Sequence, residues 1–216
     1  MAVSKRNRTR EKLLIAAQEL LLEGGFSALG IQALTERADV ALGTMYNYFR
    51  TREEVADAVV EILLAAFLQA MEHISKDLND PAAIVSASIR QTLHWMTPQS
   101  DFGKILFISG LPIMRYAYQV RQGFIRDMQL GVEQGRFTVK QHAIIASMIS
   151  GGVLAVLLDL FLGHMSASQI PDVAEQALLL LGINPIEAHQ IANQPLVFLD
   201  CPDFPVSSLL YLPLLS

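Results

Sequence analysis

Hydrophobic residues recur along most of the chain at the three- and four-residue spacing that is typical of amphipathic helices. The first such stretch covers residues 9–23, with Leu14, Ala17 and Leu21 in one stripe. A pair of glycines at 24–25 follows it and is expected to end the helix. The eight residues before this stretch are polar and basic, and we expect them to be disordered in the absence of DNA.

Two short helices joined by a tight turn are predicted next. The first, residues 31–38, has its apolar positions at i, i+3 and i+7, and the second runs from about 42 to 49. Met45 and Phe49 are four residues apart and can face the first helix. Asp39 lies between the helices and tolerates the left-handed backbone conformation that such a turn needs.

The second of these helices leaves hydroxyl and amide side chains for outward or flanking positions. Such groups suit base edges and phosphates in a DNA major groove. The outward or flanking residues are Leu42, Thr44, Tyr46, Asn47 and Tyr48. Leu42 has two readings: it packs on a thymine methyl, or it caps the small core and never meets DNA.

Only further helices are predicted for the rest of the chain. A long one runs from Arg52 to Leu78, with Thr51 as its N-cap and Glu54 as the capping-box partner. Others are expected at 81–98, 101–109, 114–135, 167–181 and after Asn184-Pro185. Residues 195–216 hold four prolines and many apolar residues, so this tail must pack on something, which the sequence does not identify.

Residues 143–163 form an apolar run with a single charge, Asp159. Length and apolarity alone would nominate a membrane span. The cost of Asp159 in lipid and the lack of flanking Lys or Arg clusters argue against that reading. Ser147 and Gly151 have the small-xxx-small spacing that lets two helices approach closely, so we expect this run to lie in a dimer core.

The charge of the chain is unevenly distributed. The net charge is −5, but residues 1–12 hold five basic groups and one acid, a net of 5 − 1 = +4. A basic N-terminus can reach phosphates, or it is simply solvated. The single cysteine, Cys201, excludes an internal disulfide framework and suggests a reducing compartment. Without a signal peptide, we expect a cytoplasmic protein.

The sequence gives little support for an enzyme active site or a metal site. No two of the five histidines lie at i, i+3 or i+4, and no cysteine joins them. Cys201 lies in a proline-rich tail without a neighbouring base. We therefore expect no enzymatic activity, no metal and no cofactor.

Residues 9–60 resemble the tetracycline-repressor (TetR) family of bacterial regulators. The matching strings are TREKLLIAAQELLLEGGF, LTERADVALGTMYNYF and TREEVADAVV, of which GTMYNYF is the most specific. The chain departs from the family pattern at Ala41 and Leu42, where Ser and Lys are usual, and at Leu29-Gly30. The missing lysine puts a phosphate contact at position 42 in doubt.

The resemblance implies an all-α protein with two domains. Residues 1–56 would form a three-helix helix-turn-helix DNA-binding domain, and 57–216 a helical effector-binding and dimerisation domain. The implied function is that of a ligand-responsive transcriptional repressor, released from a palindromic operator by a small hydrophobic effector. The expected DNA contacts, from the outward side chains and the resemblance, are Lys5, Arg6, Arg8, Gln32, Leu42, Thr44, Tyr46, Asn47, Tyr48 and Arg52.

The partners expected besides DNA are a second copy of the chain and the effector. The homodimer would form through residues of about 140–182. Large adaptable side chains suit an apolar pocket, although a plain core is the alternative for each of them. The expected effector-binding residues are His94, Trp95, Phe107, Met114, Tyr118 and Arg121. Two rival readings remain: a membrane-associated protein built on 143–163, and an α-helical enzyme acting on a hydrophobic substrate.

Overall fold

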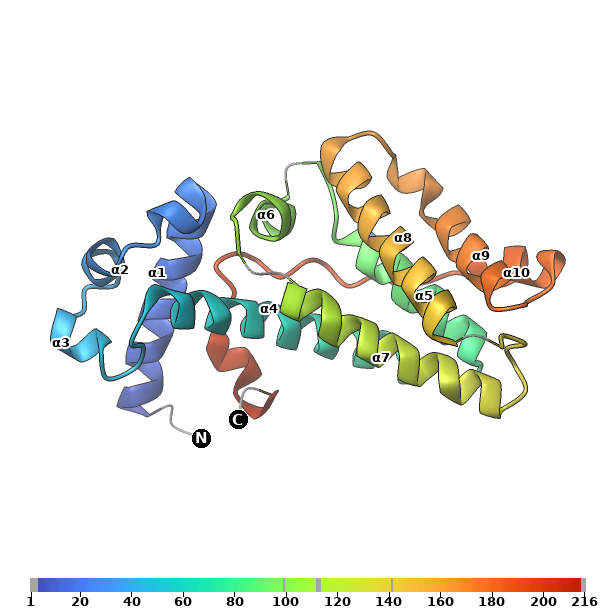
Figure 1. Ribbon diagram of the computed structural model, residues 1–216, viewed down its shortest axis with the longest axis horizontal. Coiled ribbons are helices and arrows are strands. Elements are labelled where there is room, and N and C mark those ends of the chain that lie inside the picture. The colour runs from blue at the N-terminus through green and yellow to red at the C-terminus, as the bar shows by residue number, and fades with distance from the viewer. Residues whose placement is uncertain (1–3, 99, 112–113, 141, 215–216) are drawn as a thin grey trace. The chain divides into compact units, whose positions relative to one another are not determined.

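The computed structural model describes residues 4–98, 100–111, 114–140 and 142–214. The side chains of 114–116, 119 and 212–214 lie outside this description. Over the described residues the chain forms helices and connecting segments without β-strands, as the hydrophobic pattern predicts (Figure 1).

The chain divides into two compact units. The first unit combines residues 1–67, 104–116 and 202–216, and the second combines 68–103 and 117–201. The chain therefore passes from one unit to the other four times, and α4 contributes residues to both. The domain boundary expected after residue 56 stays a prediction.

Helix α1 (Lys5–Ala28) begins earlier than the sequence predicts. Ser4 is its N-cap, because the Ser4 hydroxyl accepts a hydrogen bond from the Asn7 amide at 3.2 Å. The expectation of disorder is therefore wrong for residues 5–8, which form the first turn.

The glycine pair breaks α1 as predicted, since the backbone of Gly24 and Gly25 is not helical. Gly25 has φ = 65°, and a Cβ at this position would lie 2.9 Å from the Ser109 carbonyl oxygen. The Phe26 amide donates a hydrogen bond to the same oxygen at 2.5 Å. A residue without a side chain is required where these two backbone segments meet.

Helices α2 (Ile31–Ala38) and α3 (Leu42–Met45) form the predicted pair (Figure 1). Asp39 between them has φ = 52°, so the left-handed turn is confirmed. The α-helical part of α3 is shorter than the expected 42–49, because hydrogen-bonded turns follow Met45. Met45 and Phe49 are buried nonetheless, so the inward face is as predicted.

Helix α4 (Arg52–Ser75) starts at the expected cap. The Glu54 amide donates to the Thr51 hydroxyl at 3.2 Å. The Glu54 carboxylate accepts from the Arg50 amide at 2.7 Å, one residue before the partner that a standard capping box uses.

The second unit is built around α5 (Pro81–His94), whose most extensive contacts are with three other helices of the unit. These are α8 (His142–Leu162), α9 (Ile170–Leu180) and α10 (Pro185–Ala192). The remaining elements are α6 (Asp101–Gly103), η1 (Lys104–Ile108, first unit), α7 (Met114–Glu133) and η2 (Ala167–Gln169).

An ion-pair cluster fastens three segments of the second unit. Arg136 donates to both carboxylate oxygens of Asp80, the N-cap of α5, at 2.7 and 2.9 Å. It also donates to Glu187 of α10 at 2.7 Å. The Arg136 guanidinium holds the pKa of Asp80 below its usual value, and the two carboxylates raise the pKa of Arg136.

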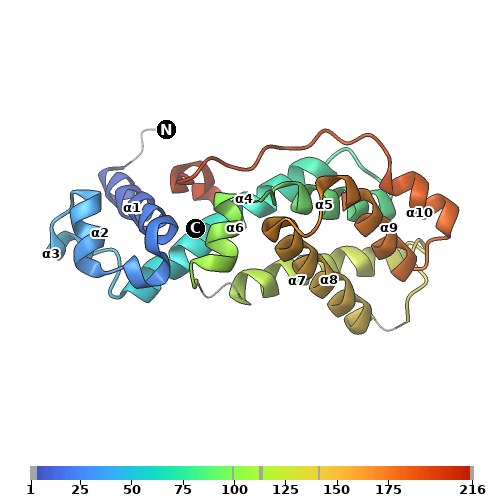
Figure 2. The same ribbon diagram turned by 90° about the horizontal axis from the view of Figure 1, so that it is seen from above.

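The C-terminal tail runs without regular helix from α10 to η3 (Ser208–Leu214) (Figure 2). Residues 194–199 dock on α5 of the second unit, and residues 204–211 join the core of the first unit. Val206 and Tyr211 are buried in that core, 2% and 7% exposed. The structure therefore places the tail that the sequence leaves unassigned.

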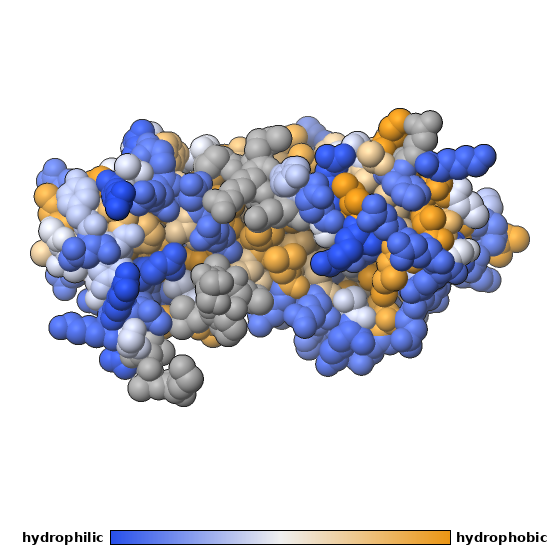
Figure 3. Space-filling model, turned by 60° about the horizontal axis from the view of Figure 1, so that its bottom comes forward, coloured by the Kyte–Doolittle hydropathy of each residue, from blue (hydrophilic) through white to orange (hydrophobic). Residues whose placement is uncertain are grey.

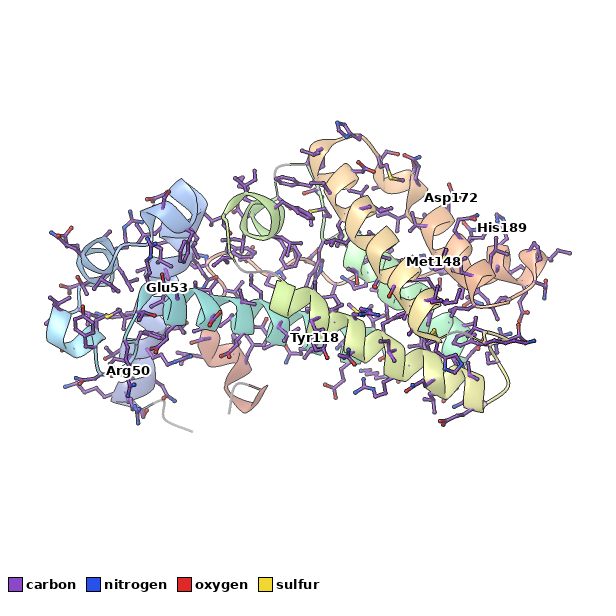
Figure 4. All side chains as sticks on the ribbon, viewed as in Figure 1. Arg50, Glu53, Tyr118, Met148, Asp172 and His189 are labelled. Carbon is purple, nitrogen blue, oxygen red and sulfur yellow. The ribbon has the colours of Figure 1, made fainter. Side chains whose placement is uncertain are left out.

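Helix α8 is long and apolar enough to cross a membrane, and only 28% of its most apolar window is buried. Large apolar residues on one side of it are more than a third exposed: Ile144, Met148, Leu154, Leu158 and Leu162. Met148 is labelled on this helix in Figure 4, and Figure 3 shows hydrophobic residues exposed among hydrophilic ones on the face that it draws. This side of α8 is thus an exposed apolar surface of the protomer.

Candidate nucleic-acid interface and effector cavity

A groove of about 260 Å³ lies in the first unit between the start of α1 and the turn before α3. Its lining residues are Lys5, Arg8, Thr9, Lys12, Asp39, Val40, Ala41 and Thr44. The helical spacing of α1 explains the basic side, since positions 5, 8 and 12 fall on one helix face. The groove therefore brings three cations to the same place as a hydroxyl of α3.

Lys12 is missing from the DNA contacts that the sequence predicts. Its signal was present, because it continues the i, i+3, i+7 series of Lys5 and Arg8. The apolar stripe that predicts this helix lies on its opposite face. Arg6, which was predicted, is exposed but does not line the groove.

Helix α3 and the turns that follow it present an exposed surface beside this groove. Leu42 and Tyr46 are 53% and 51% exposed, and Asn47 is exposed as well. Gly43 has no atom within 4 Å of where its Cβ would lie, so the surface is open there. Tyr48 differs, because its ring is half-buried and packs against the core.

Two further predicted contacts have partners within the protein. Gln32 on α2 is exposed and donates to Glu36 at 2.9 Å. Arg52 donates to Glu53 at 3.1 Å, and its guanidinium lies 4.5 Å from the ring centroid of Phe26. The role of both residues in DNA binding stays a prediction.

An ion pair links α1 and α2. Arg37 donates to Glu23 at 2.8 and 2.9 Å and to Glu19 at 3.2 Å. The hydrogen bond from Arg37 lowers the pKa of Glu23. The ion pair therefore links the helix that carries the basic face to the helix that precedes the Asp39 turn and α3.

A second cavity, of about 440 Å³, lies within the second unit. It is lined from α4, the loop before α5, α5 itself and α7 by Leu68, Met71, Glu72, Ser75, Asn79, Pro81, Ile84, Ser88, Arg126, Asp127, Leu130 and Gln134. Apolar side chains alternate with hydrogen-bonding ones. Such a mixture suits a small molecule with an apolar body and a few polar groups.

Asp127 places a half-buried carboxyl group in this cavity. Burial raises the pKa of Asp127, and the nearby guanidinium of Arg126, 3.4 Å away, opposes this only in part. A half-buried carboxylate without full compensation attracts hydrogen-bond donors. Asp127 can therefore accept a hydrogen bond from a donor group of a bound molecule.

The predicted effector residues whose side chains the structure describes do not line this cavity. His94 stacks on Phe198 of the tail, with ring centroids 4.3 Å apart, and the buried Trp95 indole donates to the Leu199 carbonyl at 2.9 Å. The prediction of effector contacts used aromatic residues, and the tail covers the end of α5 where His94 and Trp95 lie. That coverage depends on contacts across about a hundred residues, which no local pattern shows.

The other predicted effector residues are scattered. Tyr118 is 60% exposed on α7 (Figure 4), and Arg121 donates to the Ser147 hydroxyl at 2.7 Å. Phe107 belongs to the first unit, whereas the cavity belongs to the second. The side chain of Met114 lies outside the described residues. Their contact with an effector stays a prediction.

A helix-turn-helix pair supported by a third helix, joined to a larger helical unit with its own cavity, defines the class of bacterial one-component regulators. Residues 13–59 match the model of the bacterial regulatory proteins of the tetR family, and residues 80–194 match the tetracyclin repressor-like C-terminal domain. The chain belongs to the tetracycline-repressor family, which confirms the resemblance.

The curated relatives match mainly at the N-terminus. The repressor NemR of Escherichia coli K12 is 36% identical over 66 residues, 31% of this chain and 33% of NemR. The repressor KstR of Mycolicibacterium smegmatis is 33% identical over 87 residues, 40% of this chain and 39% of KstR. The chain thus spans only about a third of the length of these relatives.

Solved structures resemble the chain over most of its length. The structure of RolR in complex with resorcinol is 28% identical, covers 89% of this chain and 97% of RolR, and has a TM-score of 0.66. The Bacillus subtilis regulator FadR, solved with stearoyl-CoA, is 19% identical, covers 80% of this chain and 98% of FadR, and has a TM-score of 0.62. At that identity the likeness to FadR concerns the fold alone.

Proposed function

We propose that the protein is a homodimeric, ligand-responsive transcriptional repressor in the cytoplasm. Each protomer places α3 in the major groove of a palindromic operator. Thr44 and Asn47 read base edges, and the basic face of α1 holds the phosphate backbone. A small effector binds the second unit and favours a state with weaker operator affinity.

The observation that carries this proposal is the groove of the first unit. It sets Lys5, Arg8 and Lys12 beside Thr44, next to an exposed α3 surface. Positive charge supplies sequence-independent affinity, and exposed amide and hydroxyl groups supply base readout. Both parts of a DNA-reading surface therefore lie on one unit, despite the net charge of −5 of the whole chain.

The dimer is supported by the exposed apolar side of α8. A second copy of the chain covers this side by the same residues on both protomers. Gly151 supports the close approach, because nothing lies within 4 Å of where its Cβ would be. The alternative is that a lipid bilayer covers this side of α8. Partition of the protein into detergent would support that alternative.

The effector is a compact molecule with an apolar body and at least one hydrogen-bond donor. Leu68, Ile84 and Leu130 offer the apolar walls of the cavity, and Asp127 offers the acceptor. Resorcinol, found with RolR, is an aromatic ring with two hydroxyl donors and has this character. Phenolic compounds are therefore the first to test.

The experiment that tests the DNA-reading function is selection of bound duplexes from a random pool. The expected result is a palindrome whose half-site prefers A·T opposite Asn47, since an amide can bond adenine on two atoms. The Asn47→Ala variant should lose about 1–3 kcal/mol on that duplex and accept other bases at one position. A pool that stays unenriched, or enrichment that Asn47→Ala leaves unchanged, would contradict the proposal.

The effector is tested separately, on the selected duplex. A set of phenols, with resorcinol as the first probe, should include compounds that release the DNA. The Ser88→Phe variant, which fills the cavity, should keep operator affinity and lose that release. Ser168→Phe, at an exposed serine of η2, is the matched control and should respond like the wild type. Unchanged release in Ser88→Phe would place the effector elsewhere.

A further inference from the structure

The C-terminal tail is held at two points by the same device. At each point a fully buried glutamine exchanges two hydrogen bonds with the backbone of a single tail residue. Gln91 of α5 donates to the Leu199 carbonyl and accepts from the Leu199 amide, both at 2.9 Å. Gln18 of α1 donates to the Val206 carbonyl at 2.9 Å and accepts from the Val206 amide at 2.8 Å. Both glutamines are 0% exposed.

The dock on α5 belongs entirely to the second unit. Arg90 donates to the Gln194 carbonyl at 2.8 Å, and Trp95 adds a second donor to the Leu199 carbonyl. The ring of Phe198 stacks on His94. Directional contacts thus join the tail to α5 at both ends of residues 194–199, so this part of the tail moves with α5.

The dock on α1 belongs entirely to the first unit. Besides Gln18, the buried Glu11 carboxylate accepts from the amide of Ser208 at 2.9 Å and from the Ser208 hydroxyl. Val206 and Tyr211 complete the apolar core around it. This part of the tail moves with α1, the helix that carries the basic face of the DNA-reading groove.

The dock on α5 also continues the cavity wall. Ile84 and Ser88 line the cavity, and Gln91 and Trp95 follow at i+7 and i+11 from Ile84, on the same side of the helix. A molecule that shifts α5 when it fills the cavity therefore shifts the residues that hold Leu199. Six residues, 200–205, join this dock to the one on α1.

We propose that residues 194–214 form a strap that transmits changes at α5 to α1, in addition to the three other places where the chain passes between the units, in α4, between α6 and η1, and in α7. This inference rests on the proposed function, because the strap would link the effector-binding unit to the DNA-reading unit. It differs from a passive tail in one respect: loosening the strap at one dock changes the stability of the other. Passive packing would leave the two docks independent.

Hydrogen exchange of backbone amides tests the strap in the free protein. Gln91→Leu keeps the volume of the side chain but leaves the Leu199 amide unpaired, so exchange at Leu199 should rise about tenfold or more. The strap predicts that exchange at Val206 and Ser208 rises too, although Gln91 touches neither. Gln18→Leu should produce the reverse effect, with faster exchange at Leu199. Gln190→Leu, at an exposed glutamine of α10, is the matched control and should change none of these rates.

The outcome that would overturn the strap is faster exchange at Leu199 in Gln91→Leu, with Val206 and Ser208 as slow as in the wild type. Unchanged exchange at Leu199 itself would overturn the dock on α5. Should Gln91→Leu fail to fold, Trp95→Phe removes only the indole donor, keeps a ring beside Phe102, and is read at the same amides.

The same variants, titrated against a duplex selected from a random pool, separate the strap from the proposed function. If the wild type binds no duplex, the proposed function fails, and the exchange rates still decide the strap. If the wild type binds, Gln91→Leu should change operator affinity, whereas Gln190→Leu should not. Equal affinities of Gln91→Leu and the wild type would contradict transmission to the DNA-reading unit.

Discussion

Arg136 and Asp80 form a two-pronged ion pair across 56 positions of sequence, with both carboxylate oxygens bound at 2.7 and 2.9 Å. Glu187 shares the same guanidinium. The pair therefore fastens the cap of α5 and the start of α10 to the loop between α7 and α8. Because the groups are only partly exposed, these hydrogen bonds keep more of their strength than surface ion pairs do.

Replacing Arg136 should make the free energy of unfolding less dependent on pH in the acidic range. We expect Arg136→Met to lower the free energy of unfolding at pH 7 by about 1–3 kcal/mol, since three charge-assisted hydrogen bonds are lost. The pKa of folded Asp80 is below its usual value, so its contribution is complete above that usual value and is lost as the pH falls through the folded value. The difference between wild type and variant should therefore shrink below a pH of about 4.

Urea unfolding at pH 7 and at about pH 3, below the usual pKa of an aspartate, measures this prediction. Lys140→Met, at an exposed lysine of the same loop between α7 and α8, is the control and should leave stability unchanged at both values. An equally large difference between wild type and Arg136→Met at the two pH values would show that packing, and not charge, explains the effect.

Lys12 should behave as a phosphate contact although it was not among the DNA contacts predicted from the sequence. In Lys12→Ala, the slope of the logarithm of the DNA-binding constant against the logarithm of salt concentration should become shallower by about 0.9. This is the change expected for the loss of one phosphate contact. Arg8→Ala should do the same, because both line one groove. Lys140→Ala, in the second unit, is the control. A slope equal to that of the wild type would remove Lys12 from the interface.

Leu42 allows a test of how α3 reads DNA. The side chain is 53% exposed and lies outside the buried core of the first unit, which favours the reading in which it meets DNA. Leu42→Lys should raise affinity for all duplexes, steepen the salt slope by about one contact and blur base discrimination. A salt titration beside a thermal melt measures this. A lower melting temperature with an unchanged slope would favour the reading in which Leu42 caps the core.

Gly151 tests the assembly. No atom lies within 4 Å of where a Cβ at this position would be, so Gly151→Leu should fold and yet separate two packed α8 helices. Light scattering should then show monomers or aggregates in place of dimers. Gly123→Leu in α7, where space around the Cβ position is equally open, is the control. A normal dimer of Gly151→Leu would move the interface away from this side of α8.

Local patterns predicted what depends on neighbouring residues. Asp39 indicated the left-handed turn, and Thr51 with Glu54 indicated the start of α4, because caps and turns involve contacts within four residues. The first turn of α1, which Ser4 caps, was not predicted. Met45 and Phe49 were placed correctly because helical periodicity alone decides their side.

Long-range contacts could not be predicted in the same way. Gln18 and Gln91 look like ordinary polar positions of amphipathic helices, and their partners lie 188 and 108 residues away. The lining of the cavity was not predicted for the same reason: Ser88 and Asp127 carry no aromatic signal. The apolar run of α8 was located correctly, but its exposed side has no counterpart in the local sequence pattern.

The burial of Val206 in the core of the first unit also sets an order of folding during synthesis. Val206 is translated 206 − 59 = 147 residues after Val59, its fellow member of that core. At about 5–20 residues per second this takes roughly 7–30 s on the ribosome. The N-terminal helices emerge first, yet their core is completed last, after the segments of the second unit have all been made. A nascent chain therefore exposes an unfinished hydrophobic surface on α1 for seconds, and chaperones that hold such surfaces have their longest access there.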